Sequence, residues 1–381
     1  MIISVMKTEH IFLGIAFVMT MASCTHSDNL YDNFKVVNSL RGGEPVQVRI
    51  EPVKLDSIQC SGESFSGVTP SGNIYYLDRY SGHLYEFSKE GSLVSRKLGF
   101  GRGPEETLIK KCRYCTNSSS GEYALSGNSL DFELFSEGGK KENSFRISYG
   151  DGTTEPDSFR TYSNAWSNIV CRLNDGLFYQ GKMSENPSFN YFDNTSTYLA
   201  ESRHVSVVNM NTGEIVDMRV KGYPSIYEKN PYKYSSFQCV NFDVNNKGDF
   251  YVNFEADSLI YVFDKEMKPK RAFGASGKNM DMDYKPVSAW EQMPIYQENR
   301  ETKGCYATVE FIDETGLCFR SYKKGASSEF DGLQVYDKDG RLISDSEVPK
   351  GFKIVGYIAP DYYSQVYDNE DGSLVIYKFK L

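Results

Sequence analysis

A run of spaced glycines at residues 99–106, Gly-Phe-Gly-Arg-Gly-Pro-Glu-Glu, is the first candidate for a chemical motif in this sequence. Spaced glycines can cradle a phosphate when a helix begins directly behind them. A dinucleotide-binding loop also needs an acidic residue about 20 positions further on. Here a proline and two glutamates follow the glycines, and the carboxylates of the glutamates would repel a phosphate. We therefore expect no nucleotide site and interpret the stretch as a structural hinge, formed by Gly99, Gly101, Gly103, Pro104 and Glu106.

Metal-binding residues are sparse. The sequence contains eight cysteines and four histidines, and its only closely spaced cysteines are Cys112 and Cys115. A zinc site would need two more ligands at a matching spacing. The other cysteines are scattered and give no disulfide framework. We expect no metal ion and no cofactor.

Groupings of catalytic residues have little support. Two of the four histidines lie within or beside the N-terminal apolar segment, which leaves His83 and His204 in the folded part. These are too few to argue for a Ser-His-Asp grouping. Asp281 and Asp283 could serve a glycosidase or a calcium site, but such pairs arise by chance among 51 acidic residues.

The net charge of −9 excludes one class of partners. An acidic surface without a polybasic stripe repels the phosphates of DNA and RNA. We therefore expect no nucleic-acid partner.

The first 23 residues have the layout of a secretory signal. Lys7 precedes an apolar run over residues 11–22, which is too short to span a bilayer of roughly 30 Å. Ala22 and Ser23 directly before Cys24 resemble a bacterial lipobox, whose cysteine becomes the lipidated first residue. The alternative is an ordinary signal with an incidental cysteine. We predict a signal peptide at residues 1–23, a lipidated Cys24 with a polar tether at residues 24–43, and attachment to the bacterial outer membrane through the lipid alone.

Six short stretches share one pattern, in which a small turn residue and a glycine precede alternating apolar and aromatic residues. Their glycines lie about 60 residues apart on average, near the roughly 40 to 50 residues of propeller blades once insertions are added. After most of them, a further strand leads into an Asp, Asn or Gly turn, which is a strong hairpin signal. The six glycines are Gly72, Gly121, Gly176, Gly248, Gly316 and Gly372.

These units predict an all-β fold, a six-bladed β-propeller over residues 44–381 with an N-terminal strand closing the last blade. A small antiparallel sheet cannot bury both faces alone, but it does so when stacked radially on its neighbours. Residues 46–50 form a strand without a unit of its own, and the last unit ends at Leu381 after one strong strand. We expect these two to pair. The main alternative is a pair of β-sandwiches.

The glycine stretch and the repeated units together resemble the six-bladed propeller lipoproteins of the TolB-like group, relatives of the NHL-repeat propellers. That family carries Gly-x-Gly-x-Gly-Pro-x-Glu between blades, which residues 99–106 match. The resemblance extends over about residues 44–381, although the later units depart from it through long insertions. It implies a propeller fold and an envelope location, and it implies no catalytic residues.

Three long insertions rich in aromatic residues cover residues 184–203, 221–238 and 279–302. Propellers bind ligands on loops at the ends of the channel, so these insertions are candidate ligand sites. Aromatic faces beside Asn, Asp and Glu suit sugar rings, but tyrosines can equally pack an insertion onto the propeller or meet a protein partner. The candidate ligand-binding residues are Tyr191, Tyr227, Tyr232, Tyr234, Trp166 and Trp290, and Trp166 with Arg172 could line the channel.

The sequence thus favours an envelope-anchored lipoprotein propeller that binds or scaffolds a glycan, a peptide or an envelope protein. The alternative is a carbohydrate-active hydrolase or lyase with its site at the channel mouth. An enzyme should show charged side chains converging on one deep pocket, with perturbed acids among them. A binding module should instead show a broad aromatic surface.

Overall fold

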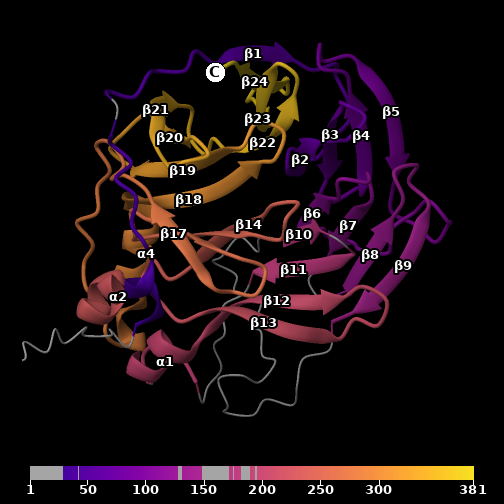
Figure 1. The fold of residues 1–381 in the computed structure, drawn as a ribbon. Helices are drawn as coiled ribbons and strands as arrows, with labels where there is room; N and C mark the ends of the chain where they lie inside the picture. The colour runs from indigo at the N-terminus through magenta and orange to yellow at the C-terminus, as the bar shows by residue number, and fades with distance from the viewer. Residues whose placement is uncertain are drawn as a thin grey trace, which may run out of the picture.

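The computed structural model describes residues 29–41, 43–127, 131–147, 171–174, 176–181, 189–193 and 195–381. The described residues form six four-stranded antiparallel sheets, arranged as blades around a central axis (Figure 1). The predicted six-bladed β-propeller is therefore confirmed. Two of the predicted site residues, Cys24 and Trp166, lie outside the described residues.

Each blade begins with the strand nearest the axis. These first strands contact one another around the ring, so they form the wall of the central channel. The first three blades are β2 (Ser64–Val68), β3 (Ile74–Asp78), β4 (His83–Phe87) and β5 (Leu93–Leu98); β6 (Tyr114–Asn117), β7 (Tyr123–Ser126), β8 (Asp131–Phe135) and β9 (Lys141–Arg146); and β10 (Cys171–Asn174), β11 (Leu177–Gly181), β12 (Arg203–Asn209) and β13 (Ile215–Lys221). The last three are β14 (Val240–Val244), β15 (Phe250–Phe254), β16 (Ile260–Phe263) and β17 (Pro269–Phe273); β18 (Lys303–Ile312), β19 (Leu317–Gly325), β20 (Asp331–Tyr336) and β21 (Leu342–Val348); and β22 (Ile354–Ile358), β23 (Asp361–Asp368) and β24 (Leu374–Phe379) with β1 (Glu51–Lys54).

The sixth blade takes its outermost strand from the N-terminal side of the first blade. β1 pairs antiparallel with β24, and Val53 lies opposite Ile376. The prediction assigned this pairing to residues 46–50, and that assignment is wrong. Val46 bridges Ser344 instead, so this segment runs along β21 of the fifth blade. Its alternating apolar residues indicated that one face is packed, but they did not indicate which sheet edge the segment would meet.

The repeated glycines mark hairpin turns. Five of the six connect the first and second strands of a blade, where their positive φ angles favour glycine. The sixth, Gly372 (φ 74°), lies between β23 and β24 and so follows the second strand of its blade. The Gly pattern therefore predicts a tight turn correctly, but it does not fix the position of that turn within the sheet.

Side chains from facing sheets fill the space between blades. Between the first and sixth blades, Tyr76 and Phe87 pack with Tyr363 and Ile376, and all four are buried. Alternate residues of a strand point to opposite faces, so each sheet contributes apolar side chains to two interfaces. Radial stacking thus buries both faces of every blade.

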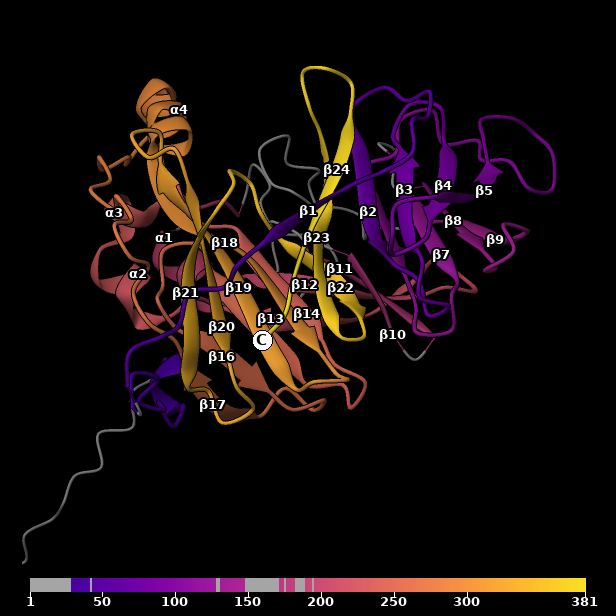
Figure 2. The same ribbon diagram turned by 90° about the horizontal axis from the view of Figure 1, so that it is seen from above.

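The helices gather over the third to fifth blades, at the lower left of Figure 1, and Figure 2 shows α4 beyond one end of β18. They belong to the predicted insertions. Within the described part of the chain, no helix has the length and apolar character needed to cross a membrane. The helices are α1 (Thr195–Glu201), α2 (Ser225–Lys229), α3 (Pro231–Tyr234), η2 (Trp290–Gln292) and α4 (Met293–Thr302).

The segment around η1 (Leu30–Asn33) packs against the rim of the fourth blade. Tyr31 and Phe34 are buried, and their ring centroids lie 4.8 and 5.1 Å from that of Tyr261. The amide of Val37 donates to a carbonyl of β17 at 2.8 Å. The predicted polar tether at residues 24–43 is therefore wrong from residue 29 onward, because two aromatic anchors within a mostly polar segment dock on the propeller.

Candidate functional site

The glycine stretch connects β5, the outer strand of the first blade, to β6, the first strand of the second. Gly99 has a φ of 143°, and the amide of Gly103 donates to Glu106 Oε2 at 2.6 Å. A Cβ atom at Gly101 would lie 2.0 Å from the same carboxylate oxygen. The glutamate side chain thus fills the space inside the loop and bonds an amide that a phosphate would need.

The central channel holds a cavity large enough for a small ligand. The cavity has a volume of about 850 Å³, within the range of small-molecule sites. Residues from the first strands of all six blades line it, so the closed ring as a whole forms its wall. Its lining is rich in hydroxyl and amide side chains, among them Ser64, Thr116, Asn117, Gln180, Asn241, Thr308 and Gln365.

Arg172 on β10 joins four blades at the cavity wall. Its Nε lies 2.5 Å from Asp243 Oδ1 on β14, and its Nη2 lies 2.6 Å from Glu310 Oε2 on β18. Its Nη1 donates to the Tyr114 hydroxyl on β6 at 3.0 Å. Asp243 is itself held in place, because its Oδ2 accepts a 2.7 Å hydrogen bond from the Phe311 amide. Burial lowers the pKa of Arg172, but the two carboxylates raise it well above its ordinary value, so the guanidinium stays charged.

Glu310 and Lys353 carry perturbed charges at the same wall. Burial raises the pKa of Glu310 to about 8, and Asp243 adds to this rise while Arg172 opposes it. Burial also lowers the pKa of Lys353, which precedes β22; the Glu310 carboxylate opposes this fall, and Arg172 adds to it. Among the described residues, none forms a hydrogen bond or an ion pair with the Lys353 ammonium group.

The lining of the cavity is positively charged although the chain carries a net charge of −9. Five basic residues and three acidic residues face it, a balance of +2. The basic residues are Arg79, Arg113, Arg172, Lys323 and Lys353, and the acidic residues are Asp243, Glu310 and Asp331.

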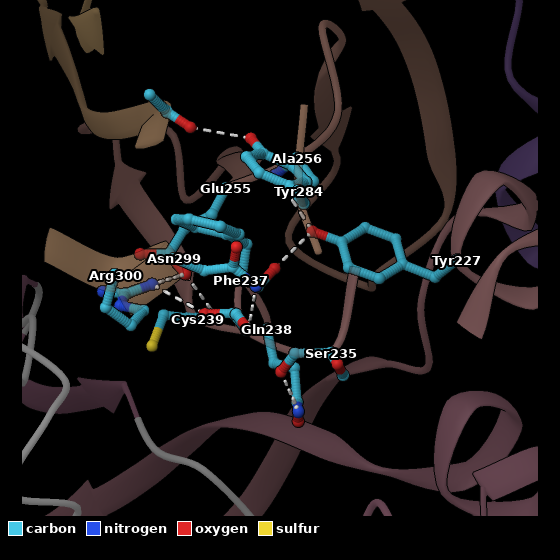
Figure 3. A network of polar contacts seen from close by, with 12 residues as sticks. Tyr227, Ser235, Phe237, Gln238, Cys239, Glu255, Ala256, Tyr284, Asn299 and Arg300 are labelled. Carbon is cyan, nitrogen blue, oxygen red and sulfur yellow. Dashed lines mark hydrogen bonds and ion pairs between the residues drawn. The ribbon is translucent and has the colours of Figure 1, made fainter. Parts of the chain in front are cut away.

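Two of the predicted aromatic ligand-binding residues are fully buried. Tyr191 and Tyr227 are both 0% exposed, so neither can form a recognition surface. The Tyr227 hydroxyl donates to the Phe237 carbonyl at 2.7 Å and accepts from the Ala256 amide at 3.0 Å (Figure 3). For these tyrosines, packing of the insertion onto the propeller is the correct interpretation.

The other predicted aromatic residues differ in exposure. Tyr232 and Trp290 are 46% and 47% exposed, and the Trp290 ring lies 4.7 Å from that of Phe192. Tyr234 is half-buried, with its ring 6.0 Å from that of Tyr284. The structure therefore leaves a small aromatic surface where the sequence predicted a broad one.

A polar network fastens the insertions to the fourth and fifth blades. Arg300 Nη1 of α4 lies 2.6 Å from Glu255 Oε2, which also accepts a 3.1 Å hydrogen bond from the Cys239 amide. Asn299 donates to Ser236 Oγ at 3.0 Å. Figure 3 shows Glu255, Asn299 and Arg300 near Phe237 and Tyr284, and Glu255 and Asn299 are buried. This network is structural.

The described part of the chain contains no metal-binding site and no disulfide bond. Among the described residues, no group of three or more His, Cys, Asp or Glu side chains could hold a metal ion. Cys112 and Cys115, the close pair of the sequence, are both free and buried. The Cys112 thiol donates to the Tyr114 carbonyl at 3.0 Å.

Arg172 was predicted as a possible channel residue, and the structure places it there. Tyr114, Asp243, Glu310 and Lys353 were not predicted. A signal for two of them was present, since Asp243 and Glu310 are acidic residues within predominantly apolar strands, each a few positions before the turn glycine of its blade. Asp243 and Glu310 both lie on first strands and line the channel cavity.

Two solved structures share this fold. A member of the DUF4221 family from Bacteroides vulgatus matches with a TM-score of 0.65 and 14% identity, covering 88% of this chain and 98% of that protein. A protein of Bacteroides fragilis, named as a candidate exported protein, matches with a TM-score of 0.51 and 13% identity, covering 91% and 100% of the two chains. At these identities the likeness shows the fold alone. No family model and no curated protein sequence matches this chain.

Proposed function

We propose that this protein is a binding protein of the bacterial cell envelope whose central channel receives a small polar ligand. One observation carries the proposal: charged and hydrogen-bonding side chains from different blades converge on a cavity of about 850 Å³. The same convergence meets the criterion for an enzyme, which is therefore the second candidate function. Ligand pockets place a few polar groups within a concave site of this size. The surface formed by the three insertions is a weaker candidate for the ligand site, because two of its predicted ligand-binding residues are buried.

The envelope location and the lipid anchor on Cys24 belong to the same proposal, as does kinship with the TolB-like propellers. The signal-like N-terminus and the lipobox-like residues before Cys24 support the first two, and the glycine stretch supports the third. Incorporation of a labelled fatty acid tests the anchor. We expect label in the wild-type protein and none in Cys24→Ala, and label in both would contradict the anchor.

The binding experiment needs a change that fills the channel without removing a charge. Ala307 lines the cavity, so Ala307→Trp should block it. Ala200→Trp is the matched control, because Ala200 is exposed on α1. Purified residues 25–381 would be screened with neutral and acidic saccharides and dipeptides by thermal shift and calorimetry. A channel ligand should lose at least about tenfold in affinity with Ala307→Trp and little with Ala200→Trp. Equal binding by both variants would exclude the channel.

A second candidate function is a hydrolase or lyase at the same channel. The raised pKa of Glu310, about 8, favours it, because a carboxyl group that stays protonated near neutral pH can donate a proton. The same saccharides incubated with the protein would be analysed by mass spectrometry. A product that forms with the wild type and not with Glu310→Gln would show that the protein is an enzyme. Binding without any product would support the function as a binding protein.

A further inference from the structure

We propose that the ligand of the channel is an acidic saccharide, with Lys353 as the residue that binds its acid group. This inference rests on the proposed function of the channel. Three features carry it: the sign of the charge in the cavity, the state of the individual cations, and the mixed aromatic and polar lining.

The positive charge of the cavity lining favours an anionic ligand. The cavity lining has a balance of +2 in a chain of net charge −9, so positive charge is concentrated in the channel. A cleft with protein walls focuses the field of its charges and raises the local concentration of the oppositely charged ligand. The acidic outer surface repels the same ligand, which directs it to the channel.

Among the cations of the cavity lining, the existing contacts of each side chain favour Lys353 as the residue that binds the acid group. The Nε, Nη1 and Nη2 atoms of Arg172 are engaged by Asp243, Tyr114 and Glu310. Arg172 therefore has little capacity for an incoming anion and acts as a positioning residue. Lys353 borders the same cavity and, among the described residues, forms no ion pair or hydrogen bond through its ammonium group.

The surroundings of Lys353 fit an anion in the cavity. Asp331, the remaining acid of the lining, lies 3.4 Å from Lys350 and accepts from the Gly351 amide at 2.8 Å, so other groups already neutralise it. Withdrawing an ammonium group from water is costly unless an opposite charge joins it. Glu310 acts electrostatically on Lys353, but no ion pair joins these two described residues, so a ligand acid group at Lys353 supplies the direct opposite charge.

The remaining lining suits the body of a sugar. Phe65 and Tyr114 both line the cavity, with ring centroids 5.4 Å apart. Aromatic rings in a cavity wall can pack against the C–H groups of a sugar. Asn241, which also lines the cavity, has an amide group suited to ring hydroxyls. A lysine is a point charge, so it accepts either a carboxylate or a sulfate ester as the acid group.

Calorimetry with three matched probes tests the inference: galacturonic acid, galactose 6-sulfate and galactose. We expect at least one acid to bind at least about tenfold more tightly than galactose, and the tighter acid identifies the acid group. Lys353→Met should abolish this preference, and Lys353→Arg should retain it. Lys338→Met is the control, because Lys338 is exposed on the turn between β20 and β21, away from the cavity lining.

Two outcomes would overturn the inference: equal affinity for galactose and both acids, or an unchanged acid preference in a folded Lys353→Met protein. Neither outcome contradicts the proposed function as long as Ala307→Trp still blocks binding. If Ala307→Trp leaves binding of every probe intact, the channel itself is the wrong site and the proposed function fails as well.

Discussion

Two arginine–carboxylate clusters in this propeller look alike and have different roles. Arg172 in the channel and Arg300 under the insertions each lie 2.6 Å from a glutamate, and their side chains are 16% and 17% exposed. Their surroundings differ. Arg300 donates to the Ser236 carbonyl and lies over the Phe237 ring, whereas Arg172 borders a cavity of about 850 Å³. Burial and ion pairing are therefore not sufficient signs of a functional site, and open space beside the charges is the distinguishing feature.

The two clusters also differ in what assembles them. The cluster of Arg300 joins residues of two insertions to the neighbouring blade, and it involves residues 236–239, 255 and 299–300. The cluster of Arg172 draws one residue from each of four blades, so it exists only when the ring is closed. Loss of the first should affect mainly stability, and changes to the second should affect mainly the ligand.

The largest effect is expected from Arg300→Met, which leaves Glu255 buried without its partner. Breaking a buried pair in this way typically costs about 3–5 kcal/mol of the free energy of unfolding. Urea denaturation measures the loss. Arg341→Met is the control, because the Arg341–Asp337 pair is largely exposed on the Arg341 side and should contribute less than about 1 kcal/mol. Equal losses of unfolding free energy in the two variants would contradict a structural role of the Arg300 cluster.

The next effect is expected from Tyr227→Phe, which deletes one hydroxyl group from the same network. The Phe237 carbonyl and the Ala256 amide then lose their hydrogen-bond partner inside the protein, which should cost about 1–3 kcal/mol. Tyr232→Phe is the matched control, since the Tyr232 side chain is 46% exposed and should tolerate the change. A destabilisation by Tyr232→Phe as large as that by Tyr227→Phe would contradict this assignment of buried and exposed tyrosines.

A smaller, pH-dependent effect is expected in the channel. Because the pKa of Glu310 is raised to about 8, ionisation of this residue costs the folded state stability. That cost is absent below the ordinary pKa of a glutamate and grows as the pH rises toward 8. Glu310→Gln removes the ionisation, so the stability of this variant relative to wild type should rise with pH. Thermal unfolding from pH 5 to 9 measures the trend.

Glu347→Gln provides a control of opposite sign. The hydrogen bond from Lys324 lowers the pKa of Glu347, so its contribution is present above the ordinary pKa and is lost as the pH falls through the lowered one. The stability of Glu347→Gln relative to wild type should therefore fall as the pH rises to about 5 and stay constant from pH 5 to 9. An equally constant difference for Glu310→Gln from pH 5 to 9 would show that Glu310 ionises like a surface acid.

The smallest effect is expected from Trp290→Ala on the insertion face. Trp290 is half-exposed and contacts Phe192 as an edge-to-face pair, so its loss should cost less than about 1.5 kcal/mol. Binding of the acidic saccharides in the channel should not change. A loss of saccharide binding in Trp290→Ala would transfer the recognition site from the channel to the insertions.

Local signals in the sequence were enough to predict the fold. Turn glycines such as Gly121 and the alternation in stretches such as residues 260–263 act over a few residues, so each hairpin can be recognised alone. The ring follows from repetition of such units. The partner of residues 46–50 could not be predicted, because several sheet edges offer the same backbone groups.

The candidate site depends on contacts between distant parts of the chain. Arg172 and Glu310 meet although 138 positions separate them. The types of the tyrosines gave no indication that Tyr227 is enclosed while Tyr232 is exposed, because the path of each insertion decides this. Composition therefore predicted an aromatic surface where the structure has mainly an aromatic core.

The docked segment before the propeller limits how far a membrane-attached molecule could lie from the membrane. Asn29 already bonds to the Tyr223 carbonyl at 2.9 Å, and five peptide units separate it from Cys24. Five extended residues reach at most about 18 Å. If Cys24 carries a lipid, the edge of the propeller at which Asn29 docks is held within about that distance of the membrane surface. The propeller can then turn about this one attachment point but cannot move far from the membrane.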